Sequence, residues 1–423
     1  MLIDFSVKNF RSIRNLLTLS MTADTKLTEK KEVLLSFRKL KVLPEVMILG
    51  PNGAGKSTLL QAVKAALSII DHSAGLKPGD SIEEIVPYLF DEQTPGEPSF
   101  FQFTFTMGDQ KYVYGFSATK EAVAEEFLYL FKTERASKVF ERDGQDFSYG
   151  APYKNRLAPL EERTSENKLL LAAGAAWNDP LCKKIVHYLT RSILVESPST
   201  IARVGHAILM NSDGLDAYKE KMISLLMESD LSISDFSLKP ESVNKDEFLE
   251  KASIPDAMKE LVKGLPVTAF MEDRSTTIHK VNGREYSLLF ESESEGTKNF
   301  FNMLPVLFNA LEYGKTVMID ELETNLHPLL IQIILRLFED PSSNKNQAQL
   351  IFTTHDVLLL GTKLLRRDQI LFIEKNHKKQ ETDLYSLADF SPRKDGNYLK
   401  NYLIGRYGAI PNLGILEGAD DFE

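Results

Sequence analysis

The chain has 423 residues, a net charge of −10, 43% hydrophobic residues and 26% charged residues, which is ordinary for a soluble globular protein. The acidic balance argues against a surface that coats nucleic acid without specificity. The single cysteine, Cys182, excludes an internal disulfide framework and a cysteine-based zinc site. No apolar run approaches the roughly 18 residues of a membrane helix. Asp4 stands where a signal peptide has basic residues, so we expect a cytoplasmic protein.

The first 150 residues predict strands around one helix. Apolar and polar residues alternate in 2–9, which indicates a half-buried strand. The apolar run 45–50 ends in glycine and is typical of a buried central strand. Helical spacing of apolar residues follows over 57–70. Residues 99–118 predict an antiparallel hairpin with a Met-Gly-Asp turn, and 125–142 would extend its sheet.

Residues 150–285 have a different pattern. Their apolar residues recur at helical spacing, interrupted by polar loops and by Pro240, Pro255 and Pro266, which predicts an inserted, mainly helical lobe. From 286 onward, predicted strands alternate with helices, and this alternation is typical of a parallel sheet with helices on its faces. We therefore predict an α/β fold whose mixed sheet draws strands from both ends of the chain, with a separate antiparallel β subdomain.

The segment Gly-Pro-Asn-Gly-Ala-Gly-Lys-Ser, residues 50–57, matches G-x-x-x-x-G-K-[ST] and lies between a predicted strand and a predicted helix. Its glycines let successive N–H groups point at phosphate oxygens, and the helix start adds its positive end. Lys56 would hold the outer phosphates, and the Ser57 hydroxyl would bind Mg²⁺. This Walker A loop predicts a site for a nucleoside triphosphate. Its predicted binding residues are Gly50, Pro51, Asn52, Gly53, Ala54, Gly55, Lys56, Ser57 and Thr58.

Acidic residues should complete this site from another strand. The apolar run before Asp320 and Glu321 predicts a strand that ends at these carboxylates. Asp320 would hold the Mg²⁺ shell, and Glu321 would orient the attacking water and accept its proton. His355 ends a further predicted strand and could position water or contact the γ-phosphate.

One more turn could bind an anion. Ser294, Glu295, Gly296 and Thr297 precede a run with helical spacing, and backbone N–H groups at a helix start attract phosphate. An ordinary N-cap before a core helix gives the same pattern.

Six ordered segments together resemble the ABC-type ATPases grouped with the AAA15 proteins. These are relatives of the heads of SMC-like, Rad50-like and RecF-like proteins, and they occur in bacterial anti-phage and abortive-infection systems. The segments are residues 9–13, 50–58, 293–297, 317–328, 349–356 and 405–411.

The resemblance implies a P-loop NTPase head that binds ATP and Mg²⁺ and hydrolyses ATP between two copies of the chain. Residues 294–297 would be the signature motif, which caps the γ-phosphate held by the other copy, and residues 325–328 would form the loop that crosses the interface. Arg11 and Ser12 would approach the nucleotide, and His355 would be the switch histidine. The Q-loop glutamine has two candidates, Gln93 and Gln102.

The predicted domains are an N-terminal ATPase lobe with Walker A and the β subdomain (1–149), the inserted lobe (150–285), and a C-terminal ATPase lobe with the signature, Walker B and switch histidine (286–423). Too few residues follow His355 for a full added nuclease domain. The resemblance implies a sensor or regulator of a separate effector, a nuclease or toxin, in anti-phage defence. The alternative is an SMC/RecF-like DNA-repair ATPase that binds DNA directly. Its basic groove would contain Lys30, Lys31, Arg38, Lys39 and Lys41. A homodimer or higher homo-oligomer is expected, without a membrane partner.

Overall fold

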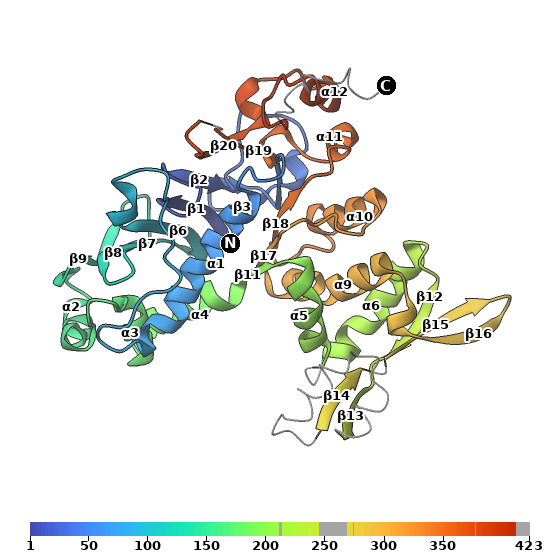
Figure 1. Cartoon of the computed structure of the whole chain (residues 1–423), viewed down its shortest axis with the longest axis horizontal. Helices are drawn as coiled ribbons and strands as arrows, with labels where there is room; N and C mark the ends of the chain where they lie inside the picture. Colours follow the sequence, from blue (N-terminus) through green and yellow to red (C-terminus); the bar gives the residue numbers. More distant parts are fainter. Residues whose placement is uncertain (211–213, 245–268, 274, 377, 412–423) are drawn as a thin grey trace, which may run out of the picture. The chain divides into compact units, whose positions relative to one another are not determined.

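The structure is a computed structural model that describes residues 1–210, 214–244, 269–273, 275–376 and 378–411 (Figure 1). The contacts within the chain divide it into two units. The first consists of Met1–Ile201 and Leu307–Glu423, and the second of Ala202–Val306. Among the helices in the described residues, none combines the length and apolar character needed to cross a bilayer.

The first unit contains a seven-stranded antiparallel sheet in the order β10-β9-β8-β7-β6-β1-β2. Five of the seven residues of β1 are buried, and in the core the ring of Phe5 lies 4.9 Å from that of Phe103. The sheet confirms the predicted N-terminal strand, the hairpin and its extension. Its strands are β1 (Leu2–Lys8), β2 (Leu17–Ser20), β6 (Ser99–Met107), β7 (Gln110–Ala118), β8 (Val123–Phe131), β9 (Ser137–Asp143) and β10 (Asp146–Tyr149).

A second sheet of the first unit has six strands in the order β11-β17-β18-β5-β19-β20. All neighbours are parallel except β20, which is antiparallel to β19. The strands β5 and β18 are buried along their whole length, and the apolar run in β5 predicts this burial. The strands are β5 (Glu45–Leu49), β11 (Ile193–Glu196), β17 (Thr316–Ile319), β18 (Gln349–Thr354), β19 (Ile370–Lys375) and β20 (Thr382–Ser386). The mixed α/β architecture and the contribution of both chain ends are confirmed.

Helices of the first unit follow the predicted apolar spacing. The helix α1 (Lys56–His72) starts directly after the glycine loop and buries Leu59, Val63 and Ile70. It contacts α3 (Leu170–Ala176) and α4 (Pro180–Ser192). The shorter helices are α2 (Lys154–Leu157), α11 (Leu359–Thr362) and α12 (Tyr398–Leu403). The helix α10 (Pro328–Glu339) begins with a proline, the position in a helix where a missing N–H costs least.

A buried amide connects the two sheets. Gln349, at the start of β18, accepts a hydrogen bond from Leu2 N at 2.7 Å and donates one to Leu2 O at 2.9 Å. The hydroxyl of Thr316 on β17 donates to the same side-chain oxygen at 2.9 Å. A buried amide whose groups are satisfied in this way fixes the register of the strands that it joins.

The second unit contains both helices and strands. The helices α5 (Pro198–Met210) and α9 (Glu295–Tyr313) each run across the boundary between the units, and α6 (Gly214–Glu228) lies within the second. A three-stranded sheet has the order β12-β15-β16, and β13 pairs with β14. These strands are β12 (Ile233–Ser237), β13 (Pro240–Asn244), β14 (Ala269–Asp273), β15 (Thr276–Val281) and β16 (Arg284–Leu289).

The second unit, Ala202–Val306, begins and ends later in the sequence than the predicted lobe, 150–285. The helices α3 and α4 were expected in the lobe (150–285) but pack against α1 in the first unit. Apolar periodicity identifies a helix without showing which core it joins, so the sequence could not place them. Strands β12–β16 also occupy part of the segment expected to be mainly helical. The predicted interruptions at Pro255 and Pro266 lie outside the described residues.

Candidate nucleotide-binding site

Four parallel strands of the mixed sheet bring the predicted site together at their carboxyl ends. The glycine loop follows β5, Asp320 and Glu321 follow β17, His355 follows β18, and β19 ends at Lys375. The edge formed by the carboxyl ends of parallel strands is where α/β sheets bind their ligands. Residues separated by some 300 positions in sequence therefore meet here.

The glycine loop lies directly on β19 and β20. Gly53 and Gly55 have φ angles of 75° and 111°, a region that favours glycine. A Cβ at Gly50 would overlap the carbonyl oxygen of Ile373, and one at Gly55 would overlap the side chain of Thr382. The close packing of the loop on β19 and β20 therefore requires glycine at positions 50 and 55. This requirement is separate from any need for glycine in binding phosphate.

Lys56 lies inside the loop, 5% exposed. Its ammonium donates to the carbonyls of Gly50 at 2.7 Å and Pro51 at 3.0 Å, and lies 3.2 Å from Nδ1 of His355. Burial lowers the pKa of Lys56, while the carboxylates of Glu323, Asp320 and Glu321 act in the opposite direction. A cation held at the mouth of a glycine loop in this way is placed to bind a phosphate.

Thr353 positions the two predicted acids. Its hydroxyl donates to Asp320 Oδ1 at 2.5 Å and accepts the backbone N–H of Glu321 at 2.8 Å. Glu321 has a φ angle of 50°, and its carboxylate is 48% exposed and 3.6 Å from Nε2 of His355. The turn therefore directs the Glu321 carboxylate toward His355 and leaves part of it exposed to solvent. A carboxylate that contacts a water molecule needs such exposure.

A third acid, Glu323, was not among the predicted site residues. One of its carboxylate oxygens accepts the backbone N–H of His355, and the other is buried without a hydrogen-bond partner among the described residues. Its charge contributes more than that of any other carboxylate to holding Lys56 protonated. The acid run Asp320-Glu321-Leu322-Glu323 was the signal that could have indicated it.

A cavity of about 470 Å³ opens between these groups. Lys375 from β19 also lines it, and no sequence motif indicated that residue. The predicted residues that line it are Ser12, Asn52, Gly53, Gly55, Lys56, Ser57, Thr58, Glu321 and His355.

Seven predicted nucleotide-site residues of the first unit are not part of this lining: Gly50, Pro51, Ala54, Asp320, Arg11, Gln93 and Gln102. Arg11 donates its backbone N–H to Val86 O at 2.7 Å, and its guanidinium lies 5.8 Å from the ring of Phe10. Gln93 and Gln102 are not among the described residues that line the cavity. Gln102 instead sits within β6, opposite Ser6 of β1. The Q-loop assignment stays a prediction.

The donor set suits a magnesium ion that arrives with a nucleotide. Ser57 offers a hydroxyl and Asp320 a carboxylate, both oxygen ligands of the kind that Mg²⁺ prefers. In the described part of the chain no group of three His, Cys, Asp or Glu residues could hold a metal alone. Mg²⁺ in phosphate sites is usually held by one or two carboxylates with the remaining ligands from phosphates and water.

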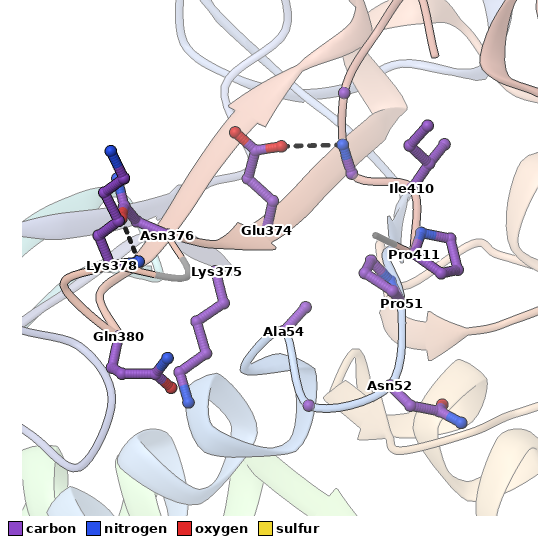
Figure 2. Close-up of a pocket in the computed structure, with 13 residues that line it drawn as sticks. Pro51, Asn52, Ala54, Glu374, Lys375, Asn376, Lys378, Gln380, Ile410 and Pro411 are labelled. Carbon is purple, nitrogen blue, oxygen red and sulfur yellow. Dashed lines mark hydrogen bonds between the residues drawn. The ribbon is translucent and has the colours of Figure 1, made fainter. Parts of the chain in front are cut away.

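A larger cavity of about 850 Å³ lies beside the first, and Figure 2 shows its lining. The two cavities share Asn52, Gly53 and Lys375. Residues 408–411 form one wall, where Glu374 accepts the backbone N–H of Ala409 at 2.8 Å and the Tyr385 hydroxyl at 3.0 Å. The segment 405–411 therefore packs beside the glycine loop.

In the second unit the predicted signature turn caps a helix. Ser294 accepts the backbone N–H of Thr297 at 3.1 Å, and the two hydroxyls lie 2.9 Å apart. Ser294 and Glu295 are exposed, whereas Thr297 is buried. The geometry is that of an N-cap at the start of α9, and contact with the nucleotide of a second copy stays a prediction.

The predicted interface loop, 325–328, makes a similar start to α10. His327 accepts the backbone N–H of Leu329 at 3.3 Å, and Asn325 has a φ angle of 59°.

A parallel sheet with a glycine-lysine loop after one strand and paired acids after another defines a P-loop NTPase, a class that binds a nucleotide with Mg²⁺. A family model described as "AAA domain, putative AbiEii toxin, Type IV TA system" matches residues 46–361. The match spans most of the chain, which therefore belongs to this family of ABC/SMC-like P-loop ATPases. No curated protein matches the chain.

Proposed function

We propose that this chain hydrolyses ATP with Mg²⁺ as a dimer of two copies, and that it regulates a separate effector in anti-phage defence. The observation that carries the proposal is the convergence of Lys56, Glu321 and His355 on one cavity at the ends of β5, β17 and β18. Each of these groups has a defined part in phosphoryl transfer to water.

The chemistry follows from the positions of the side chains. The loop N–H groups and Lys56 would bind the outer phosphates, and Ser57 with Asp320 would hold a magnesium ion, which would neutralise phosphate charge. Glu321, exposed and beside His355, orients a water molecule and accepts its proton. His355 is held in place through its backbone N–H by Glu323.

Dimerisation is supported by the signature turn. Ser294 and Glu295 are exposed at the start of α9, a helix of 19 residues whose amino end favours an anion. Two copies related by a two-fold axis would each place this turn on the nucleotide of the other and so bind two ATP molecules between them.

The effector part of the proposal is supported by the family description, which refers to a toxin of a toxin–antitoxin system. Direct DNA binding receives less support from the basic residues that would carry it. Lys30 is paired with Glu339, and Arg38 donates to the carbonyls of Asp109 and Lys132. Cations used within the chain are less available to phosphates of DNA.

The proposal is tested with Glu321→Gln. Removing a general base should lower ATP hydrolysis by about 10²- to 10⁴-fold and leave ATP binding intact. The variant should therefore accumulate with ATP and Mg²⁺ as a species of twice the monomer mass in light scattering. Lys56→Ala, which cannot hold the phosphates, is the control and should stay at the mass found without nucleotide.

A Glu321→Gln variant that binds ATP but keeps its nucleotide-free mass would refute the dimer. If the protein is oligomeric before ATP is added, a crosslink between cysteines introduced at Glu295 and Asn52 replaces the mass measurement. It should form between copies only when ATP is bound.

A further inference from the structure

An exposed aromatic ring lies beside the nucleotide cavity on a loop that no motif indicated. Phe90 is 66% exposed, and its ring centroid is 6.0 Å from the ammonium of Lys375. Lys375 itself lines both cavities at the glycine loop. Single exposed apolar side chains are common on protein surfaces, so the position of this ring, rather than its exposure, is the informative observation.

The strand order gives a direction for a nucleotide whose γ-phosphate lies at the acids. Glu321 and His355, which act at the terminal phosphate, follow β17 and β18 on one side of β5. Lys375 ends β19 on the other side of β5. A triphosphate with its γ-phosphate at the acids would then extend toward Lys375, which would bring its nucleoside next to Phe90.

The ring of Phe90 rests on a well-fixed support. The buried Tyr88 meets it edge-on, with centroids 5.7 Å apart and planes at 70°. The Tyr88 hydroxyl donates to Lys379 O, and the Arg14 guanidinium lies 5.9 Å from the Tyr88 ring. Arg14 in turn pairs with Asp91 and with Glu381, the latter at 2.7 Å. These contacts tie the loop that carries Phe90 to the loop between β19 and β20.

We propose that Phe90 stacks on the base of the bound nucleotide, while Lys375 lies over its sugar–phosphate end. This inference rests on the proposed function, because it places the base from the position of the γ-phosphate. Bases present a flat π-face to an aromatic ring, and a ring held in place before binding loses little freedom when the base arrives. Phe90 is thereby a binding residue for the nucleoside, and its contact accounts for the difference between the affinity for ATP and the affinity for the phosphates alone.

The test compares ATP with inorganic tripolyphosphate, which has the phosphates without the nucleoside. Both are titrated with Mg²⁺ into the full chain by calorimetry. Base–aromatic stacking corresponds to roughly a 5- to 100-fold change in affinity on replacement by alanine. Phe90→Ala should weaken ATP binding by this factor and leave tripolyphosphate binding unchanged, whereas Phe90→Tyr should bind both as the natural chain does.

The neighbouring Leu89 provides a matched control, since it is equally exposed, at 65%, and has no ring. Leu89→Ala should bind both ligands as the natural chain does. Unchanged ATP binding in Phe90→Ala overturns the inference, and so does an equal loss for ATP and tripolyphosphate, which would show a displaced glycine loop. A natural chain that binds neither ligand would instead overturn the proposed function itself.

Discussion

Replacing Thr382 by valine should loosen the glycine loop, because this side chain connects it to the loop that carries Ser12. The hydroxyl of Thr382 donates to Ala54 O at 3.1 Å and lies 2.8 Å from the hydroxyl of Ser12. Its backbone N–H also donates to Ser12 O at 2.9 Å. Thr382 is only 4% exposed, so water is a poor substitute for these contacts.

The size of the effect follows from what valine removes. Valine has the shape of threonine without the hydroxyl, so the buried carbonyl of Ala54 and the partly buried hydroxyl of Ser12 each lose a partner. An unsatisfied buried group costs about 1–3 kcal/mol of the free energy of unfolding. The Ala54 peptide also precedes Gly55 at the start of α1, and a loss of its fixed orientation should weaken ATP binding about tenfold, or about 1.4 kcal/mol.

Urea unfolding and calorimetric ATP titration measure the two quantities separately. The matched control is Thr382→Ser, which keeps the hydroxyl and loses only a methyl group. It should lower the free energy of unfolding by about 0.8 kcal/mol and bind ATP as the natural chain does. The reasoning is refuted if Thr382→Val retains the natural affinity, or if Thr382→Ser loses as much affinity as Thr382→Val.

Two further substitutions test the sheet below the site. Gly50→Ala should lower the free energy of unfolding by about 1–3 kcal/mol, because its Cβ would meet the backbone of Ile373. Gly75→Ala is the control and should leave the free energy of unfolding unchanged, since a Cβ there meets nothing within 4 Å. Equal urea midpoints for the two variants would contradict this packing. Burial, reinforced by the carboxyl of Glu339, raises the pKa of Glu45 well above its usual 4.5. The folded chain then holds this proton more tightly than the unfolded chain, so its stabilising effect is complete below pH 4.5 and declines as pH rises. Glutamine cannot titrate, so the melting temperature of Glu45→Gln should exceed that of the natural chain, and this difference should widen from pH 5 to pH 8. A difference that stays constant over this range would show that Glu45 titrates normally.

The sequence predicted the parts of the site that follow apolar strands. The glycine-lysine motif identified the loop, and Asp320, Glu321 and His355 were found because each ends an apolar run. Parallel strands bring such ends together, and the structure places Glu321 and His355 on one cavity with Lys56. The reasoning worked here because local pattern and strand direction are enough to locate these residues.

The residues that the sequence did not indicate act through packing between distant segments. Lys375 belongs to β19 and Thr382 to β20, and their relation to the glycine loop arises only when β19 pairs with β5. Phe90 lies in a loop without periodicity, so neither a strand nor a helix pattern marks it. Side-chain contacts of this kind depend on which segments are neighbours in the sheet, and that information is not local.

The position of β5 in the mixed sheet affects how the protein is made. Its two neighbours, β18 and β19, lie at 349–354 and 370–375, some 300 residues after β5 leaves the ribosome. At translation rates of about 5–20 residues per second, β5 waits roughly 15–60 s for either partner. Throughout that interval the four apolar residues and both hydrogen-bonding edges of the strand have no partner strand, which favours aggregation or chaperone binding. The cavity at the glycine loop, which Lys375 lines, is therefore complete only after synthesis has passed Lys375.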